Sequence, residues 1–250
     1  ANVDTIFLVM ALTGDFNLRR LERYLALAWS SGADPVVVLN KADLCPELEG
    51  RLLAVDAVAV GVPVHAVSAV TGAGLDALAP YLWPGRTVAL LGSSGVGKSS
   101  LANALLGEAR LLVNAVRADD ERGRHTTTSR QLLRLPGGAL LLDTPGMRSV
   151  GLWTAEDGLQ RAFDDIASLE AACRFSDCGH AGEPGCAVLA AVADGSLSED
   201  RLDSRRKLER ELEMLAARHD PLLRAERRRR FKQQGQGGRA AMLAKRGGSA

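Results

Sequence analysis

Three things are scarce in this 250-residue sequence: long apolar runs, cysteines and net charge. No stretch approaches the ~18 consecutive apolar residues of a membrane-spanning helix. The start also lacks the basic segment that opens a secretory signal peptide. The apolar and charged fractions, 46% and 24%, are those of an ordinary globular chain. We therefore expect a cytoplasmic protein with no membrane partner, built as one large domain or two smaller ones.

The net charge of +1 conceals an uneven distribution of charge along the chain. Residues 201–250 carry 15 Lys and Arg against 6 Asp and Glu, whereas residues 1–200 carry 16 against 24. A basic tail on an acidic body is typical of proteins that contact nucleic acid. A solvated helix with charged faces explains the part over 201–220 equally well. The denser run over 227–232 favours a polyanionic partner, and we expect residues 223–250 to form a basic tail that is disordered when free and orders on ribosomal RNA.

A glycine-rich segment between an apolar run and a helical pattern carries the most specific motif. Residues 87–91 indicate a buried strand, residues 98–107 indicate a helix, and the spacing Gly-x-x-x-x-Gly-Lys-Ser between them is complete. In such a loop the backbone N–H groups point at a phosphate, the lysine reaches the β- and γ-phosphates, and the serine binds Mg²⁺. We predict a nucleoside triphosphate site made by Gly92, Ser93, Ser94, Gly95, Val96, Gly97, Lys98, Ser99 and Ser100.

The segment Asn40-Lys41-Ala42-Asp43 follows a predicted strand over 35–39 and has the form of a guanine-reading element. The Asp43 carboxylate can accept hydrogen bonds from both the ring N1–H and the exocyclic amine of guanine, whereas adenine offers no matching donors. We expect Asn40 to hold the loop and contact the base, and the stem of Lys41 to cover one face of the ring. The predicted nucleotide is therefore GTP or GDP.

Ser68 and Ala69 follow a third predicted strand, over 62–67, and resemble the GTPase element whose backbone N–H contacts the guanine oxygen. We interpret His65, within that strand, as a packed core histidine. Apolar patterns predict further strands over 3–12, 131–135 and 139–143, and helices over 17–29, 52–60, 75–82 and 198–217. Buried strands that alternate with helices indicate an α/β protein.

Residues 108–130 lose the apolar periodicity and gain charge, which is typical of a mobile switch loop. One of the three threonines at 126–128 is expected to bind Mg²⁺ together with Ser99. We favour Thr127, which would also sense the γ-phosphate.

The predicted strand over 139–143 ends in Asp143-Thr-Pro-Gly146. This places Asp143 near the Mg²⁺ shell and the Gly146 N–H near the γ-phosphate. Met147 occupies the position at which Ras-like proteins have a water-orienting Gln, and a thioether cannot do that work. His125 is the uncommitted histidine of the switch loop, and its near-neutral pKa suits it to orient or deprotonate water. We predict His125, Lys98 and Thr127 as the catalytic residues, and for His125 an exposed loop histidine is the alternative.

Three of the four cysteines cluster with a histidine: Cys173, Cys178, His180 and Cys186. Three thiolates and one imidazole make a closed tetrahedral zinc site, which is structural because no ligand position stays open. Three free cysteines and a surface histidine are the alternative. Zinc would stabilise a small, loop-rich domain with little core of its own. We interpret Cys45 as a small apolar residue.

The motifs occur in a permuted order, with the base-reading element ahead of the phosphate loop and the threonine switch and Asp-x-x-Gly after it. In ordinary GTPases the phosphate loop comes first. This order together with the metal cluster resembles the circularly permuted small-ribosomal-subunit biogenesis GTPases of the RsgA/YjeQ type. The segments that carry the resemblance are Asn40–Asp43, Gly92–Ser100, Gly123–Thr128, Asp143–Arg148, Gly151–Trp153 and the Cys/His cluster.

The resemblance implies a P-loop NTPase fold in which residues 1–155 form the permuted GTPase domain, 156–222 a small zinc-binding and mainly helical domain, and 223–250 the tail. It implies GTP/GDP, Mg²⁺ and one structural Zn²⁺ as bound groups, and the same role for His125. It also implies the small (30S) ribosomal subunit and its rRNA as partners, and we expect a monomer. The family carries an N-terminal OB-fold, and we expect no such barrel within these 250 residues.

Three functional hypotheses follow from the sequence. The leading one is a GTP hydrolase that assists late maturation of the small ribosomal subunit and leaves it on hydrolysis. The second is a GTP-gated binding module whose own turnover is negligible and whose zinc domain is the effector arm. The third is a permuted GTPase that acts on the large subunit or on a tRNA.

Overall fold

The computed structural model describes residues 2–109, 111, 131–143 and 156–219. Within this part of the chain, six strands form one sheet in the order β3-β2-β1-β4-β6-β5. All neighbouring strands run parallel except β5 and β6, which form an antiparallel hairpin at one edge. The strands are β1 (Thr5–Ala11), β2 (Asp34–Asn40), β3 (Val64–Ala66), β4 (Thr87–Leu91), β5 (Gln131–Arg134) and β6 (Leu140–Asp143).

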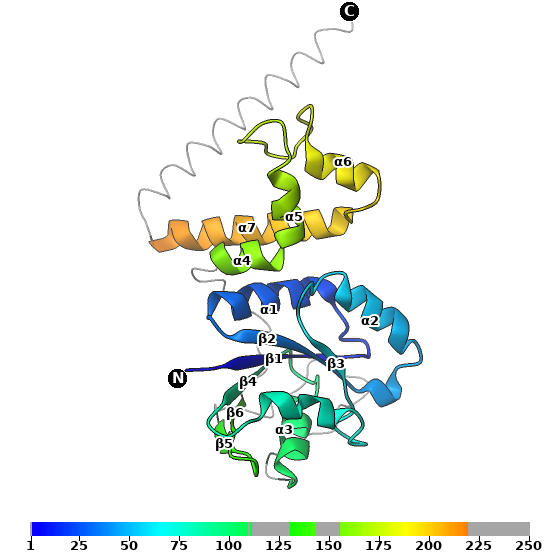
Figure 1. The fold of residues 1–250 in the computed structure, drawn as a ribbon, viewed down its shortest axis with the longest axis vertical. Helices are drawn as coiled ribbons and strands as arrows, with labels where there is room; N and C mark the ends of the chain where they lie inside the picture. The colour runs from blue at the N-terminus through cyan, green and yellow to red at the C-terminus, as the bar shows by residue number, and fades with distance from the viewer. Residues whose placement is uncertain (1, 110, 112–130, 144–155, 220–250) are drawn as a thin grey trace, which may run out of the picture.

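Helices cover both faces of the sheet (Figure 1). On one face lie α1 and α2, and on the other lie α3 and the 3-10 helix η2. The C-terminal helices lie beyond α1, on the side away from the sheet. The helical elements are α1 (Leu18–Ser30), η1 (Ala42–Leu44), α2 (Leu48–Asp56), η2 (Leu75–Tyr81), α3 (Lys98–Leu106), α4 (Glu156–Ala162), α5 (Asp164–Glu170), α6 (Ala187–Ala193) and α7 (Glu199–His219).

Between their terminal residues the central strands β1 and β2 are apolar on both faces, and both faces are covered. Along β1, Phe7 and Val9 belong to the core under α3, whereas Leu8 and Met10 belong to the core under α1. Strand β2 alternates in the same way. Such two-sided burial is characteristic of parallel strands flanked by helices, and it explains why the apolar runs predicted these strands correctly.

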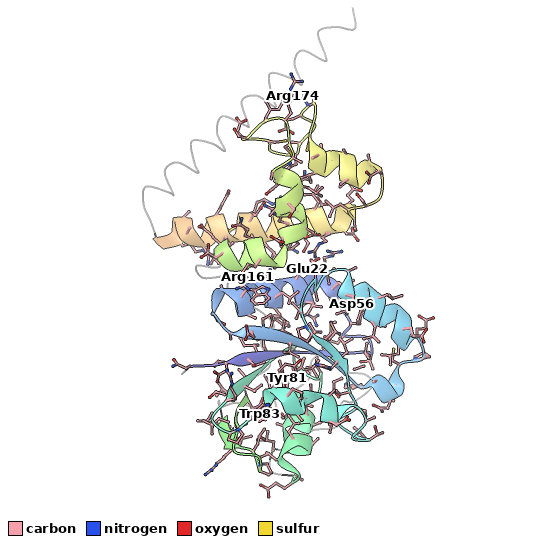
Figure 2. All side chains as sticks on the ribbon, viewed as in Figure 1. Glu22, Asp56, Tyr81, Trp83, Arg161 and Arg174 are labelled. Carbon is pink, nitrogen blue, oxygen red and sulfur yellow. The ribbon has the colours of Figure 1, made fainter. Side chains whose placement is uncertain are left out.

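Helix α1 lies between the sheet and the C-terminal helices, so it is covered on two sides. Its N-terminus is capped by the Asn17 side chain, whose Oδ1 accepts from the backbone N–H of Arg20 at 2.9 Å. Gly158 of α4 lies directly against the α1 backbone, where a Cβ would collide with the Ala26 carbonyl oxygen. Arg161 of α4 lies over the Trp29 ring of α1, 3.8 Å from its centroid (Figure 2).

The predicted elements appear with shifted ends. The helix expected over 52–60 is α2, which begins at Leu48 and ends at Asp56. The element expected over 75–82 is a 3-10 helix with Pro80 inside it, and the strand expected over 62–67 shortens to Val64–Ala66. His65 is half-buried, and its Nε2 lies 2.9 Å from the Tyr81 hydroxyl. Burial lowers the pKa of His65, which agrees with a packed, neutral histidine.

None of the helices in the described part of the chain combines the length and the apolarity that a membrane crossing requires.

Candidate functional site

The predicted nucleotide-binding segments follow the carboxyl ends of neighbouring parallel strands. Asn40 ends β2, Ser68 follows β3, the phosphate loop follows β4, and Asp143 ends β6. Because these strands run parallel in one sheet, their carboxyl ends meet at the same edge. The structure therefore brings together segments that lie up to about a hundred residues apart in the chain.

The phosphate loop has the backbone curl that its glycines predict. Gly95 and Gly97 adopt positive φ angles of 86° and 94°, a conformation that side chains disfavour. Gly92 lies so close to β1 that a Cβ would collide with the Val9 carbonyl oxygen. Gly97 immediately precedes α3, so the loop presents a helix N-terminus to an anion.

Asn40 connects the base-reading segment to both other loops. Its side chain is 1% exposed, and its Nδ2 donates to the Val96 carbonyl oxygen at 2.9 Å. Its Oδ1 accepts from the Ala69 backbone N–H at 3.1 Å. A Cβ on Gly97 would collide with the same Nδ2. One buried amide thus fixes the base-reading, Ser-Ala and phosphate segments relative to one another, which is the juxtaposition that the sequence predicts.

The residues around Asn40 leave the base-reading side chain accessible. Lys41 has a left-handed φ of 64°, and its Nζ donates to the Gly95 carbonyl oxygen at 2.9 Å. The left-handed conformation of Lys41 leads the chain into η1, where Asp43 is exposed. Ser68 is buried, and its Oγ accepts from the Thr71 N–H at 3.1 Å. The Ala69 N–H, expected at the guanine oxygen, donates to Asn40 here, so contact with a base would require this amide to share its hydrogen.

Lys98 lies inside the loop with only 7% of its surface exposed. Its Nζ donates to the carbonyl oxygens of Gly92 and Ser93, at 2.9 and 2.7 Å. Burial disfavours the ammonium and lowers the pKa of Lys98 to about 8, although the carboxylates of Asp143 and Asp15 oppose this shift. Lys98 is therefore a buried cation whose charge a phosphate would favour.

The predicted Mg²⁺ ligands lie partly within the described residues. Asp143 is fully buried at the end of β6, beside Leu90 of β4. Ser99 lies in the first turn of α3 and is half-buried. The hydroxyl and the carboxylate are oxygen donors of the kind that Mg²⁺ prefers, so this pair fits the ion. The remaining predicted residues, His125, Thr127 and Gly146, lie outside the described residues, as do the other switch threonines and the tail over 223–250.

The predicted metal ligands converge in the C-terminal helical part. The ligand atoms of Cys173, Cys178, His180 and Cys186 all lie within 4.8 Å of one another. The His180 Nδ1 lies 3.3 Å from the Cys186 Sγ and 3.8 Å from the Cys173 Sγ. Tetrahedral zinc with ordinary bond lengths separates its ligand atoms by roughly 3.5–3.8 Å. The Cys₃His donor set therefore fits one structural zinc ion, and Nδ1 is the atom of His180 that faces it.

A second layer of polar side chains holds the His180 ring. Its Nε2 lies 2.9 Å from Oε1 of Glu170, whose other oxygen accepts from Arg205 of α7 at 2.7 Å. Arg206 of α7 donates to the His180 carbonyl oxygen. A carboxylate behind a ligating imidazole fixes the ring and its tautomer, as is usual at zinc sites. Cys45 lies elsewhere, half-buried against the core under α1.

Sequence reasoning missed the polar residues that connect α1 to its surroundings. Asp15 and Arg20 contact Ser93 of the phosphate loop, and Glu22 pairs with Arg201 of α7. A signal for Asp15 was present, because it follows β1, whose carboxyl end lies between those of β2 and β4. No pattern in the sequence indicates the Glu22–Arg201 pair.

Comparison with known proteins gives a consistent result. The family model described as RsgA GTPase matches residues 1–153. A small ribosomal subunit biogenesis GTPase RsgA from Streptomyces avermitilis is 56% identical over 99% of this chain and 67% of its own length. The Streptomyces coelicolor protein of the same name is 54% identical over 99% of this chain and 68% of its own length. The chain thus spans about two thirds of the length of these curated relatives.

Solved structures agree with this result. YjeQ from Thermotoga maritima is 32% identical with a TM-score of 0.60, over 85% of this chain and 72% of that one. YloQ, described as a circularly permuted GTPase, is 27% identical with a TM-score of 0.59, over 84% of this chain and 68% of that one. The mixed α/β sheet, the permuted motif order and the Cys₃His cluster of this chain all agree with these matches. The chain belongs to the RsgA GTPase family.

Proposed function

We propose that this chain is a GTP hydrolase that assists late maturation of the small (30S) ribosomal subunit, binds its rRNA, and is released on hydrolysis. The observation that carries the nucleotide part is the Asn40 bridge, which joins the base-reading segment to the phosphate loop. The relatives that match nearly the whole chain are named as small-subunit biogenesis GTPases, which supports the ribosomal part.

The residues around the site divide the work of binding. Asp43, exposed beside the Asn40 bridge, accepts from the two guanine donors, and the stem of Lys41 covers the ring. The loop amides from Gly92 to Ser100 and the Lys98 ammonium bind the phosphates. Ser99 and Thr127 would hold Mg²⁺ directly and Asp143 would hold its shell through water, and the ion would neutralise charge on the phosphates.

Hydrolysis also requires a group that orients the attacking water. We assign this role to His125, with Thr127 and the Gly146 N–H at the γ-phosphate. The expected result of His125→Ala is unchanged GTP binding and at least a tenfold loss of stimulated turnover, which is within the range of general-base loss. Undiminished turnover would remove His125 from the mechanism.

The C-terminal part supplies the contacts with the ribosome. Residues 156–222 form the zinc-binding helical domain beside the GTPase domain of residues 1–155, and the basic tail of 223–250 binds rRNA phosphates. Such contacts weaken as salt rises. The chain acts in the cytoplasm as a monomer.

Two measurements test this function. Isolated small subunits should raise GTP turnover well above the intrinsic rate, and turnover that stays negligible would instead favour a GTP-gated binding module. With a non-hydrolysable GTP analogue, the chain should be retained on small subunits and not on large ones. Retention on large subunits or on tRNA would overturn the proposed target.

A further inference from the structure

We propose that Asp15 and Arg20 are positioning residues of the nucleotide site, because they clamp Ser93 and so hold the phosphate loop against the start of α1. This inference rests on the proposed function, since it concerns the loop that would bind GTP. On this proposal, the connection between β1 and α1 belongs to the nucleotide site.

The clamp consists of three side chains from two distant segments. The Ser93 Oγ donates to the Asp15 Oδ2 at 2.7 Å and accepts from the Arg20 NH1 at 2.9 Å. Arg20 also forms an ion pair with the Asp15 carboxylate, and its NH1 lies 3.4 Å from the Asp15 carbonyl oxygen. Ser93 is 7% exposed, so its hydroxyl uses both its donor and its acceptor capacity inside the protein.

Ser93 also contacts Lys98, the lysine of the loop, through its backbone carbonyl group. Its carbonyl oxygen accepts from Lys98 Nζ at 2.7 Å. The clamp on the hydroxyl and the lysine on the carbonyl therefore hold the same residue from two sides. The negative charge of Asp15 further favours the ammonium form of Lys98. Through Ser93, the start of α1 is thus connected to Lys98, whose ammonium would contact the phosphates.

The partial exposure of the pair argues for positioning over stabilisation of the fold. The side chains of Arg20 and Asp15 are 33% and 28% exposed, and ion pairs with this much solvent contact contribute little to folding stability. A phosphate loop, in contrast, depends on backbone amides that converge on one point, and a misplacement of about 1 Å can cost roughly a hundredfold in rate. The cavity behind the clamp measures only about 10 Å³, room for at most one water, so the cluster is not a separate ligand site.

The experiment compares three variants with a matched control. Arg20→Gln, Asp15→Asn and Ser93→Ala each remove one member of the clamp. Arg86→Gln is the control. Arg86 pairs with Asp4 at 3.0 Å beside the amino end of β4, at the end of the strands opposite to the nucleotide site. For each protein, the Kd of fluorescent GDP and of fluorescent ADP and the melting temperature without nucleotide are measured.

We expect the three clamp variants to bind GDP about tenfold more weakly, as the loss of a charge-assisted hydrogen bond implies, while Arg86→Gln binds as wild type. Melting temperatures should change no more than in the control, and the preference for GDP over ADP should persist because the base-reading segment is untouched. Asp15→Asn combined with Ser93→Ala should be no worse than either change alone.

Two results would overturn the proposal. One is wild-type GDP affinity in Arg20→Gln, which is the variant least at risk of misfolding because Arg20 is partly exposed. The other is weakened binding that is matched by a lower melting temperature and a lost guanine preference, which would indicate general loosening. A wild-type protein that fails to bind GDP would instead refute the proposed function.

Discussion

Arg201 of α7 pairs with Glu22 of α1 at 3.0 Å, and the two side chains are only 6% and 0% exposed. Arg201 also binds the Asp165 carboxylate at 2.6 and 2.8 Å and the Ala162 carbonyl oxygen at 3.0 Å. Glu22 accepts in addition from the Ser204 hydroxyl. These contacts join α1 to α4, α5 and α7. Figure 2 shows Glu22 at this boundary.

Removal of Arg201 alone should destabilise the chain strongly. Arg201→Ala removes the more buried of the two arginines, Arg19 and Arg201, that pair with the Glu22 carboxylate among the described residues, and the loss of a buried ion-pair partner costs about 3–5 kcal/mol. Urea unfolding measures the change in the free energy of unfolding. Arg86→Ala, which breaks an exposed pair with Asp4, should cost less than about 1 kcal/mol.

Replacement of both Glu22 and Arg201 by apolar residues separates the cost of an unpaired buried charge from the cost of lost packing. Glu22→Leu combined with Arg201→Met should recover most of the loss, because apolar residues of similar volume avoid the desolvation penalty. A double variant as unstable as Arg201→Ala would show that the hydrogen bonds of Arg201 to α4 and α5 dominate over the ion pair.

The sequence predicted the nucleotide edge of the fold well because its signals there are local. The phosphate-loop spacing constrains one turn and one helix start, and β4 and α3 occupy the predicted residues. Asn40 is the last residue of a strand with a clear apolar run, and Asp43 follows that strand. The parallel sheet then brings these ends together without further information.

The attachment of the C-terminal helices could not be predicted, because it depends on contacts distant in sequence. Gly158 reads as a poor helix residue, yet α4 needs it to approach the backbone of α1. Arg201 lies in a segment rich in charges of both signs, which fits a solvated helix equally well. Only the fold shows that Arg201 and Ser204 of α7 are buried against α1, where both contact Glu22.

Asp43→Asn should convert the base preference of the site. An amide accepts from N1–H but cannot accept from the exocyclic amine, so GDP affinity should fall by at least about a hundredfold. The same amide can donate to the oxygen that xanthine carries in place of the amine, so xanthosine diphosphate should bind better than GDP. Competition with a fluorescent nucleotide measures both. Asp76→Asn, at an exposed residue of η2, is the control, and a loss of GDP binding without this gain would argue against base contact by Asp43.

The Cys₃His cluster should hold one zinc ion per chain. Cys178→Ser removes one ligand and should release most of the metal, with a lower melting temperature for the C-terminal helices, because structural zinc contributes directly to folding. Metal analysis and circular dichroism measure the two effects. Cys45→Ser removes the cysteine outside the cluster and should keep the full metal content. Equal zinc content in both variants would contradict the assignment.

Glu170→Gln tests the layer behind the zinc ligands. The amide keeps the shape of the side chain but weakens its hold on the His180 ring, so zinc affinity should fall about 10–100-fold. Competition with a chromogenic chelator measures this change. Glu209→Gln, which loses a pairing to Arg205 at the exposed side of α7, should leave zinc affinity unchanged.

Nucleotide affinity should fall above pH 8 because of Lys98. In the free chain its pKa is about 8, and a bound phosphate favours the ammonium and raises that pKa. Below pH 7 the lysine is charged in both states, so it adds no pH dependence to the Kd of GDP there. Above pH 8 the free lysine loses its proton and binding must restore it, so the Kd should rise by up to about tenfold per pH unit.

Titrations with fluorescent GDP from pH 6.5 to 8.8, without Mg²⁺, measure this profile. Asp15→Asn removes one of the two carboxylates that favour the ammonium, so its rise in Kd should begin at lower pH. Asp203→Asn, 64% exposed on α7, removes the same charge away from the site and should follow the wild-type curve. Calorimetry in two buffers of different ionisation enthalpy should detect proton uptake above pH 8. A flat profile without proton uptake would show that Lys98 keeps its proton throughout this range.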